Sequence, residues 1–261
     1  MKQMRKLGTH NLGLNFTHGA QRDPSSRRMR CVGIPQSRLD DSISKLVALG
    51  YKVGVVLEIE SSQMGCKIVS RSLLRIFTPG VITEDNMIGM ETRFACCLFP
   101  TAFMCDQFVQ SDLKCGICFL DASTAQFHLG VAANFVELET QIKKFQPREI
   151  LFPIQMLSQK VKLRLTSASP TLIWTFLKEG EMDGGFWAPS SVPDRLRPYF
   201  ENHLDENVNA LCKQLHTPEI AGAFGGMASY LRRLKLDRDI LPNSQFFFLN
   251  SSSLNQLGPM A

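Results

Sequence analysis

The chain has 261 residues, of which 44% are hydrophobic and 20% are charged, and its formal net charge is +5. This length is enough for one large domain or two domains of ordinary size. No run of residues comes near the roughly 18 consecutive apolar positions of a membrane-spanning helix, and a disordered chain would contain far fewer apolar residues. We therefore expect a soluble globular protein and exclude the membrane and disordered classes.

The cysteines and the distribution of charge indicate the cellular compartment and the kind of binding partner. Eight cysteines without a recognisable secretion signal are typical of reduced, buried thiols in an intracellular protein. Residues 1–75 contain 13 Lys and Arg against 5 Asp and Glu, whereas the other 186 residues contain 16 against 19. This asymmetry favours contact between the N-terminal part and a polyanion, and an ordinary solvated basic face is the equal alternative.

Residues 12–57 are expected to form a small α/β unit. Apolar residues at helical spacing predict a helix that begins near Asp40 or Asp41 and ends at Gly50. The other expected elements, read from alternating apolar residues and from Gly, Pro and Ser, are a strand at 12–16, a loop at 17–28, a strand at 31–37 and a strand at 51–57.

A second α/β core is expected over residues 94–176, after an extended segment at 68–77. Its expected elements are strands at 94–99, 147–152 and 171–176, a hairpin of 114–120 with 125–130, and helices at 134–145 and 154–166. From residue 184 the pattern becomes helical, with segments near 191–214 and 218–235.

Two features could carry chemistry in the second core. Cys115 and Cys118 have the spacing of a metal or redox pair, but a strand sends positions three apart to opposite faces, so we expect core thiols. Asp121 ends a strand where an RNase-H-like nuclease would hold a divalent metal, which needs further carboxylates. Those available are Glu137, Glu139, Glu149 and Asp183. Nothing in their spacing brings them together, so a turn aspartate is the favoured interpretation.

The basic loop is the candidate for binding. Arg22, Arg27, Arg28 and Arg30, together with the basic N-terminal residues, would neutralise several phosphates and give strongly salt-dependent binding. A flexible surface loop is the alternative. The sequence contains no glycine-rich phosphate loop of the Gly-Lys-Ser/Thr type and no nucleophile motif, so we expect no complete active site.

Short segments along the whole chain combine into a recognisable order. They are 12–16 (LGLNF), 33–36 (GIPQ), 46–53 (LVALGYKV), 75–80 (RIFTPG), 115–130 (CGICFLDASTAQFHLG), 184–187 (GGFW), 226–231 (GMASYL) and 254–257 (LNQL). In this order they resemble the MutS family of DNA mismatch repair proteins. The first three resemble the second half of its mismatch-binding domain, the next two resemble the entry and opening hairpin of its connector domain, and the rest resemble the approach to its helical lever domain.

The resemblance implies an α/β fold in four parts. Residues 1–62 would be the C-terminal part of a mixed α/β mismatch-binding domain, 63–92 a connecting segment, 93–183 an RNase-H-like connector domain, and 184–261 a helical segment leading into a truncated lever. The Gly-Phe-Trp step and the Tyr-Lys-Val run resemble the eukaryotic sixth-homologue class, which is the mismatch-reading subunit of a nuclear heterodimer.

The family resemblance also implies a function and a set of DNA contacts. The full-length family binds mismatched duplex DNA with ATP-dependent signalling, with a second MutS homologue as partner, and we expect a nuclear location. The residues implied as DNA contacts are Thr17, His18, Arg22, Arg27, Arg28 and Lys52. The alternative is a protein–protein interaction module, in which the connector docks onto a partner homologue or repair factor without a DNA role of its own.

Two parts of the family pattern are missing from this sequence. The Phe-x-Glu wedge is expected just upstream of residue 7, and the clamp and ATPase are expected after residue 261. Because ATP and Mg would bind that ATPase, we expect no catalytic residue, metal or cofactor in this chain. Without the wedge we expect only weak, sequence-blind binding to duplex phosphates, with no preference for mismatched DNA.

Overall fold

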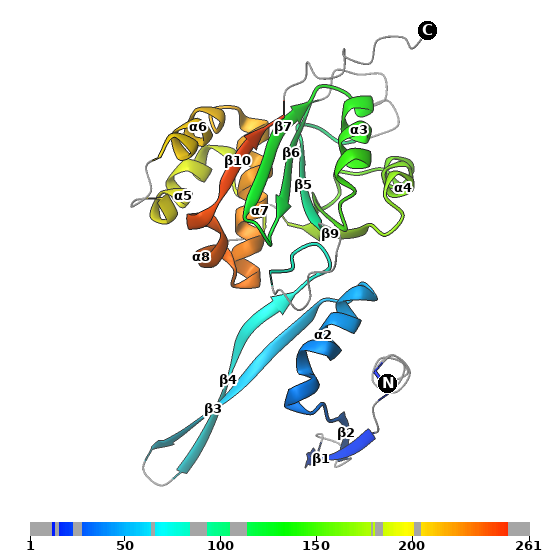
Figure 1. Cartoon of the computed structure of the whole chain (residues 1–261), viewed down its shortest axis with the longest axis vertical. Coiled ribbons are helices and arrows are strands. Elements are labelled where there is room, and N and C mark those ends of the chain that lie inside the picture. Colours follow the sequence, from blue (N-terminus) through cyan, green and yellow to red (C-terminus); the bar gives the residue numbers. More distant parts are fainter. Residues whose placement is uncertain are drawn as a thin grey trace.

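A computed structural model of the chain describes residues 12–13, 16–22, 28–63, 66–83, 93–104, 114–178, 180, 185–200 and 205–249. The described elements form two units that lie one above the other in Figure 1. The N-terminal unit spans residues 16–77 and contains β1 to β4 with α2. The C-terminal unit spans residues 94–249 and is built on one six-stranded sheet.

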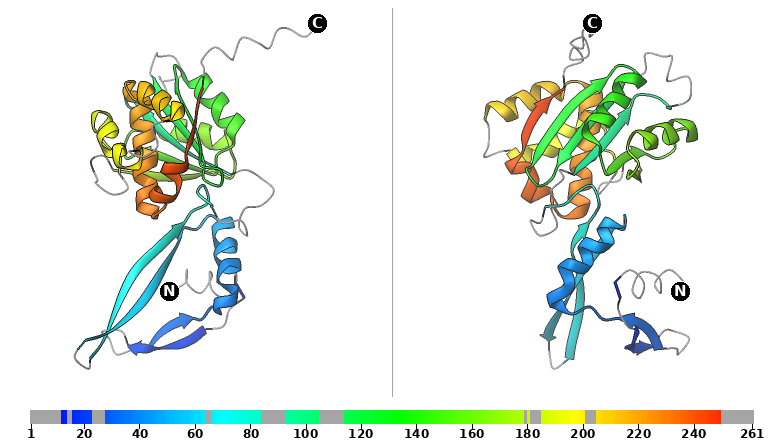
Figure 2. Two further views of the ribbon diagram at one scale, coloured as in Figure 1. Left: turned by 60° about the vertical axis from the view of Figure 1, so that its left-hand side comes forward. Right: turned by 45° about the vertical axis from the view of Figure 1, so that its right-hand side comes forward.

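The N-terminal unit consists of two antiparallel strand pairs and one helix. Strand β1 (Phe16–Arg22) pairs with β2 (Arg28–Val32), and β3 (Val53–Gln63) pairs with β4 (Cys66–Phe77) along its whole length. A 3-10 turn, η2 (Gln36–Arg38), leads into α2 (Leu39–Ala48). In Figure 2, α2 runs beside the β3–β4 ribbon, from the β1–β2 pair at one end to the C-terminal unit at the other.

Helix α2 is held by a small apolar core. Ile43 and Val47 lie one turn apart and are both buried, and they pack with Phe77 and Ile82 from the end of β4 and the segment after it. Asp40 and Asp41 occupy the first turn of α2, where carboxylates interact favourably with the helix dipole. The core of this unit is small, so its stability and its orientation depend on a limited number of contacts.

The sheet of the C-terminal unit mixes antiparallel and parallel pairing. Its strands are β5 (Phe94–Pro100), β6 (Cys115–Asp121), β7 (Gln126–Ala132), β8 (Glu149–Pro153), β9 (Ile173–Leu177) and β10 (Gln245–Phe248), in the spatial order β10-β7-β6-β5-β8-β9. The β5–β6 and β6–β7 pairs are antiparallel, whereas β8, β9 and β10 each pair in parallel with their neighbours. The expected mixed α/β fold is confirmed.

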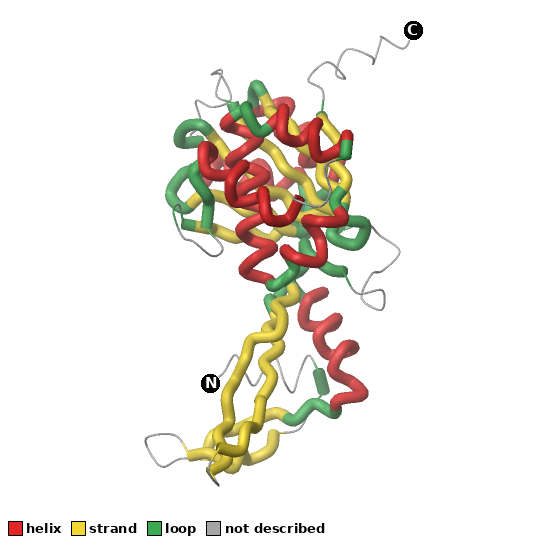
Figure 3. The backbone as a smooth tube through the Cα atoms, turned by 90° about the vertical axis from the view of Figure 1, so that its left-hand side faces the viewer, coloured by secondary structure: helices red, strands yellow, loops and turns green. Residues whose placement is uncertain are grey.

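Helices cover both faces of this sheet. Figure 3 shows helices in front of the strands of this unit, with the long β3–β4 ribbon below it. Helices α3 (Phe135–Phe145) and α4 (Gln159–Ala168) cover one face. The other face is covered by α5 (Val192–Phe200), α6 (Glu206–Gln214), α7 (Pro218–Leu234) and α8 (Asp237–Ile240), with the short turns η4 (Pro189–Ser191) and η5 (Leu241–Asn243). None of the helices within the described ranges is long and apolar enough to span a membrane.

Strand β6 is buried on both faces, which settles the environment of the cysteine pair. Cys115 packs in the core under α3 and α4, whereas Cys118 packs in the core under α7. The two side chains therefore point to opposite faces, as the spacing predicts. Burial raises the pKa of the Cys115 thiol to about 12 and the pKa of the Cys118 thiol well above its usual value, so both are unreactive core groups.

Glycine residues let α7 approach the sheet closely. A Cβ at Gly116 of β6 would lie 1.9 Å from the carbonyl oxygen of Glu219 in the first turn of α7. A Cβ at Gly226 would lie 2.5 Å from the Phe186 ring. Gly225 meets Val192 of α5, and Gly226 meets Phe186 and Cys97, so this pair lies at a packing contact inside α7 and not in a phosphate-binding turn.

The structure differs from the expected elements at several places. Residues 17–22 were expected in a loop and lie in β1, and in place of the strand expected at 31–37 the structure has β2 at Arg28–Val32 and the turn η2. Strand β1 begins at Phe16, where the predicted strand was to end, because pairing with β2 and not the alternation at 12–16 decides its position. Residues 184–261 were expected to lead into a separate lever. Instead, α7 packs on β5 and β6, and β10 joins the sheet beside β7, so residues 185–249 complete the C-terminal unit.

The contact between Gly116 and α7 yields a stability prediction. Gly116→Ala places a methyl group against a backbone carbonyl that cannot move aside, so we expect a loss of about 3 kcal/mol in the free energy of unfolding. Gly33→Ala is the matched control, since its Cβ meets no atom within 4 Å, and we expect a change below about 0.5 kcal/mol. Urea unfolding followed by circular dichroism measures both. Equal stability of the two variants would contradict the close contact.

Candidate nucleic-acid interface

The β1–β2 pair brings the expected basic residues of the N-terminal unit together. In its register Arg22 lies opposite Arg28, His18 lies opposite Arg30, and Thr17 lies opposite Cys31. The pairing is irregular between His18 and Arg22. Arg27 was also an expected contact and lies outside the described residues. Five of the six expected DNA-contact residues thus fall within described segments, and four of them lie on this one strand pair.

The charge of this strand pair suits an anionic ligand. Residues 16–32 contain four arginines and one acidic residue, Asp23. Like charges at directly opposed positions of an antiparallel pair destabilise it, and an anion placed against them removes that penalty. Arginine makes bidentate hydrogen bonds to phosphate, and the register brings Arg22, Arg28 and Arg30 onto one strand pair. The strand pair is therefore the candidate nucleic-acid interface.

Lys52 is not part of this interface. It lies between α2 and β3, at the end of the N-terminal unit that faces the C-terminal unit, and its ammonium group has three partners. Lys52 Nζ is 2.8 Å from Glu149 Oε1, and it donates hydrogen bonds to Thr175 Oγ1 at 2.6 Å and to Tyr230 Oη at 2.9 Å. Since these partners use the three donors of the ammonium group, the structure gives Lys52 a role in joining the units.

Glu149 is the centre of this group, which we call the Glu149 cluster and which comprises Lys52, Glu149, Thr175 and Tyr230. The Glu149 side chain is 0% exposed, whereas Lys52 is 36% exposed. Thr175 and Tyr230 each donate a hydrogen bond to Glu149 Oε1, at 2.5 Å and 2.8 Å. A Cβ at Gly80 would lie 2.5 Å from the Cβ of Glu149, so only glycine fits over this carboxylate.

The surroundings of Glu149 favour its ionised form. Burial alone opposes ionisation, but the charge of Lys52 and the hydrogen bonds from Lys52, Thr175 and Tyr230 outweigh it, so the pKa of Glu149 is lowered from its usual value. The same burial, with the neighbouring carboxylate, raises the pKa of Tyr230 well above its usual value. At neutral pH the cluster therefore contains a carboxylate, an ammonium group and a protonated phenol.

Asp121 does not meet the carboxylates that a metal site would need. Asp121 lies opposite Phe94, which packs under α3 and α4, whereas Glu149 lies opposite Ala95, which packs under α7. The two carboxylates are thus on opposite faces of the sheet. Asp121 Oδ1 accepts hydrogen bonds from the Ser123 amide at 3.0 Å and the Ser123 hydroxyl at 2.6 Å. In the described part of the chain, no three His, Cys, Asp or Glu side chains gather to hold a metal ion.

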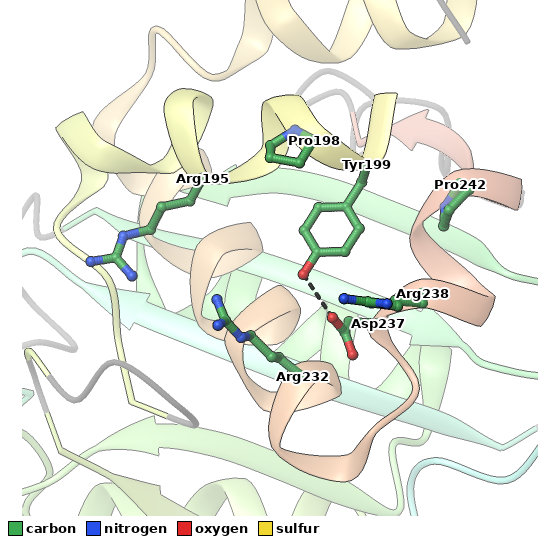
Figure 4. A pocket seen from close by; sticks show the side chains of 7 residues that line it. All are labelled: Arg195, Pro198, Tyr199, Arg232, Asp237, Arg238 and Pro242. Atoms are coloured by element: carbon green, nitrogen blue, oxygen red, sulfur yellow. Dashed lines mark hydrogen bonds between the residues drawn. The ribbon is translucent and has the colours of Figure 1, made fainter. Parts of the chain in front are cut away.

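A second basic feature lies between α5, α7 and α8, and the sequence did not reveal it (Figure 4). A cavity of about 490 Å³ there is lined by Arg195, Pro198, Tyr199, Arg232, Asp237, Arg238 and Pro242. Tyr199 Oη donates a hydrogen bond to Asp237 Oδ2 at 2.7 Å, and burial together with this carboxylate raises the pKa of Tyr199 to about 12. Three guanidinium groups and one carboxylate leave the lining with a positive charge, which suits an anionic group.

Comparison with known proteins gives the family. The family model for MutS domain I matches residues 6–86, and the model for MutS domain II matches residues 102–245. The chain belongs to the MutS family. The two matched segments correspond to the two units of the structure, and the match to domain II extends to residue 245, so it includes the helices α5 to α8.

Several bacterial proteins are similar to this MutS-family chain. It is 27% identical over 202 residues to the DNA mismatch repair protein MutS of Dehalococcoides mccartyi strain CBDB1, covering 77% of this chain and 20% of the relative. It is 24% identical over 230 residues to the MutS protein of Desulforamulus reducens, covering 87% and 24%. It is 32% identical over 143 residues to that of Phocaeicola vulgatus, covering 54% and 15%. The chain thus spans about a fifth of the length of the curated relatives it matches.

These relatives correct one expectation. The prediction of a nuclear location was wrong, because the MutS proteins found are bacterial and their cells have no nucleus. The prediction of the MutS family itself is confirmed by the two domain matches.

The pKa of Glu149 gives a prediction for the pH dependence of stability. Since this pKa is lowered in the folded protein, the ionised carboxylate stabilises the fold above the usual glutamate value of 4.5, and that stabilisation is lost as the pH falls through the lower folded value. We expect Glu149→Gln to lower the free energy of unfolding by about 1–2 kcal/mol at pH 7, a modest figure because Lys52 is partly exposed.

The difference between wild type and Glu149→Gln should shrink steadily below pH 4.5. Urea unfolding at several pH values measures it, with the fluorescence of Trp174 and Trp187 as the signal, since both lie in the C-terminal unit. A difference that stays constant from pH 7 to pH 3 would contradict an ionised Glu149 in the folded protein.

Proposed function

We propose that this chain serves in DNA mismatch repair, and that its β1–β2 strand pair contacts the phosphate backbone of duplex DNA. The observation that carries the proposal is the register of that pair, which sets Arg22 opposite Arg28 and His18 opposite Arg30. Membership of the MutS family supports the choice of ligand, because the relatives are named as DNA mismatch repair proteins.

Phosphate contacts position a protein on DNA but carry no base information. Binding through arginines on one strand pair should therefore be sequence-blind, and its affinity should fall steeply with salt as counterions are released. We expect this strand pair to contribute the same binding free energy on fully paired and on mismatched duplexes. Thr17 and His18 belong to the proposed interface by their positions on β1, whereas Lys52 is left out because its donors are used within the Glu149 cluster.

We propose binding and not catalysis as the contribution of this chain. Asp121 is engaged by Ser123, and Glu149 belongs to the cluster at the opposite face of the sheet, so neither supports a nuclease. A second MutS homologue as partner, and the eukaryotic sixth-homologue class, stay predictions. The bacterial relatives give the latter no support, so the assignment stops at the MutS family, to which the chain belongs.

An interaction module is the second candidate function, and one observation favours it. The β3–β4 ribbon exposes large apolar residues, namely Val56, Leu57, Leu73 and Leu74. In the register Val56 lies opposite Leu73, so these two form an exposed apolar pair, whereas Leu57 lies opposite Ser72. Exposed apolar residues that lie together mark surfaces that other proteins cover. Self-association or capture of a repair protein, combined with no binding to duplex DNA at low salt, would favour this function over DNA binding.

The DNA proposal predicts the effect of removing two arginines. The double variant Arg22→Ala/Arg28→Ala should bind a 30-base-pair duplex with at least tenfold lower affinity at low salt, and each lost phosphate contact should reduce the slope of log K against log salt by about 0.9. Fluorescence anisotropy at several salt concentrations measures both quantities, on a fully paired duplex and on one with a single G·T mispair.

The control removes the same charge elsewhere. Arg197 and Lys213 are exposed on α5 and α6 of the C-terminal unit, and Arg197→Ala/Lys213→Ala should leave the affinity within about twofold. If both double variants lost the same affinity for duplex DNA, binding would depend only on the net charge of the chain, and the proposed interface would be overturned. A larger loss on the mismatched duplex would overturn the phosphate-only contact.

A further inference from the structure

We infer that Lys52 is a positioning residue, whose insertion into the Glu149 cluster fixes the orientation of the N-terminal unit on the C-terminal unit. The inference deepens the proposed function, because it concerns how the proposed DNA-contacting strand pair is presented. Three members of the cluster belong to the C-terminal unit: Glu149 on β8, Thr175 on β9 and Tyr230 on α7. Lys52 is the member that the N-terminal unit contributes.

The three groups of the C-terminal unit need a positively charged partner to balance the buried carboxylate. Thr175 and Tyr230 donate their hydroxyl hydrogens to Glu149 Oε1 and accept from Lys52 Nζ, so each hydroxyl has both a donor role and an acceptor role. Glu149 Oε2 is buried and has no hydrogen-bond partner among the described residues. The carboxylate therefore relies on Lys52 for the charge that offsets its burial.

Apolar contacts also join the units. Ile76 of β4 packs against the core under α7, and a Cβ at Gly50 would lie 3.0 Å from the Ile173 side chain. A cavity of about 480 Å³ lies between the end of α2 and the segment before β9, lined from the two sides by residues 47–50 and 170–173. The cavity interrupts the apolar contact between the units, and the Lys52 ion pair is a polar link beside it.

Helix α2 separates Lys52 from the β1–β2 pair, so a small rotation at Lys52 moves the strand pair by a larger distance. Lys52 follows the C-terminal end of α2, and the β1–β2 pair precedes the N-terminal end of the same helix (Figure 1). A helix of 10 residues is about 15 Å long. A rotation at Lys52 is therefore transmitted along α2 and displaces the strand pair that carries Arg22 and Arg28.

Loss of the Lys52 charge has a defined consequence. Without Lys52, burial opposes the ionised form of Glu149, which can respond by binding a proton or by opening of the joint so that water reaches the carboxylate. At neutral pH we expect the joint to open. The two units would separate while each stays folded. Removing the carboxylate as well removes the reason to open, since the amide introduced by Glu149→Gln is neutral and keeps hydrogen-bonding groups for Thr175 and Tyr230.

The experiment compares Lys52→Met, Lys52→Arg and the double variant Lys52→Met/Glu149→Gln by small-angle X-ray scattering. Lys52→Met should increase the radius of gyration and the maximum dimension, whereas Lys52→Arg keeps the charge and should retain the wild-type values. The double variant should return towards the wild-type values. Lys45→Met is the matched control, because Lys45 is an exposed lysine of α2 that pairs with Asp41 in the same unit.

A readout inside the C-terminal unit separates opening from unfolding. Trp174 and Trp187 both lie in that unit, so their emission spectrum should stay the same in Lys52→Met. Unchanged scattering of Lys52→Met, expansion without recovery in the double variant, or a red-shifted tryptophan spectrum in Lys52→Met would each overturn the positioning role. No DNA is used, so failure of the proposed DNA contact would show in the anisotropy experiment and leave this result standing.

Discussion

Burial of one carboxylate organises the junction of this protein. Glu149 begins β8, which lies between β5 and β9 of the C-terminal sheet, and its side chain is fully removed from solvent. Removing a partner from a buried ion pair usually costs about 3–5 kcal/mol, because the remaining charge is left without compensation. In this protein the cost of burying the Glu149 carboxylate is offset by two hydroxyl groups of the C-terminal unit and by the Lys52 ammonium group of the N-terminal unit. The polar chemistry of the core thus extends across the boundary between the units.

The geometry of the Glu149 cluster depends in turn on close helix–sheet packing. Gly116, Gly222 and Gly226 leave no side chain where α7 meets β5, β6 and the residues before α5, so the helix backbone lies against the sheet. This approach brings the Tyr230 hydroxyl within 2.8 Å of Glu149. A wider spacing would withdraw that hydroxyl and leave the ammonium group of Lys52 with fewer acceptors. The packing of small residues in one unit therefore determines how the other unit is attached.

Local sequence patterns predicted individual helices and strands better than they predicted which elements pack together. The β6–β7 hairpin and α3 follow from a turn at 122–125 and from Asn134, whose side chain accepts a hydrogen bond from the Glu137 amide as an N-cap. Helical spacing also predicted α7, but periodicity does not say which surface a helix covers, so α7 and β10 were assigned to a lever and not to the sheet.

For the candidate site too, the sequence showed which residues belong to it but not how they are paired. The arginines of the β1–β2 pair were visible as a local charge cluster, and the register that opposes Arg22 and Arg28 required the structure. Lys52 was assigned to DNA by its charge, because its partner Glu149 is distant in sequence. One signal was available: Glu149 is the charged residue that opens the apolar run ILF, where an ionisable side chain needs a buried partner.

Charge balance separates the two groups of basic residues in this molecule. Several cations of the described part pair with carboxylates of the same chain: Lys45 with Asp41, Arg71 with Glu58, Arg164 with Glu139 and Arg197 with Asp194. Lys52 belongs to this group through Glu149. Residues 16–32 differ, since four arginines share a segment with one acidic residue and cannot be neutralised within it. A two-stranded pair is marginally stable by itself, and like charges at opposed positions weaken it further. Such a segment gains most from an external polyanion, whereas the joint that holds it is already neutral, so salt should weaken the proposed DNA contact much more than the attachment of the units.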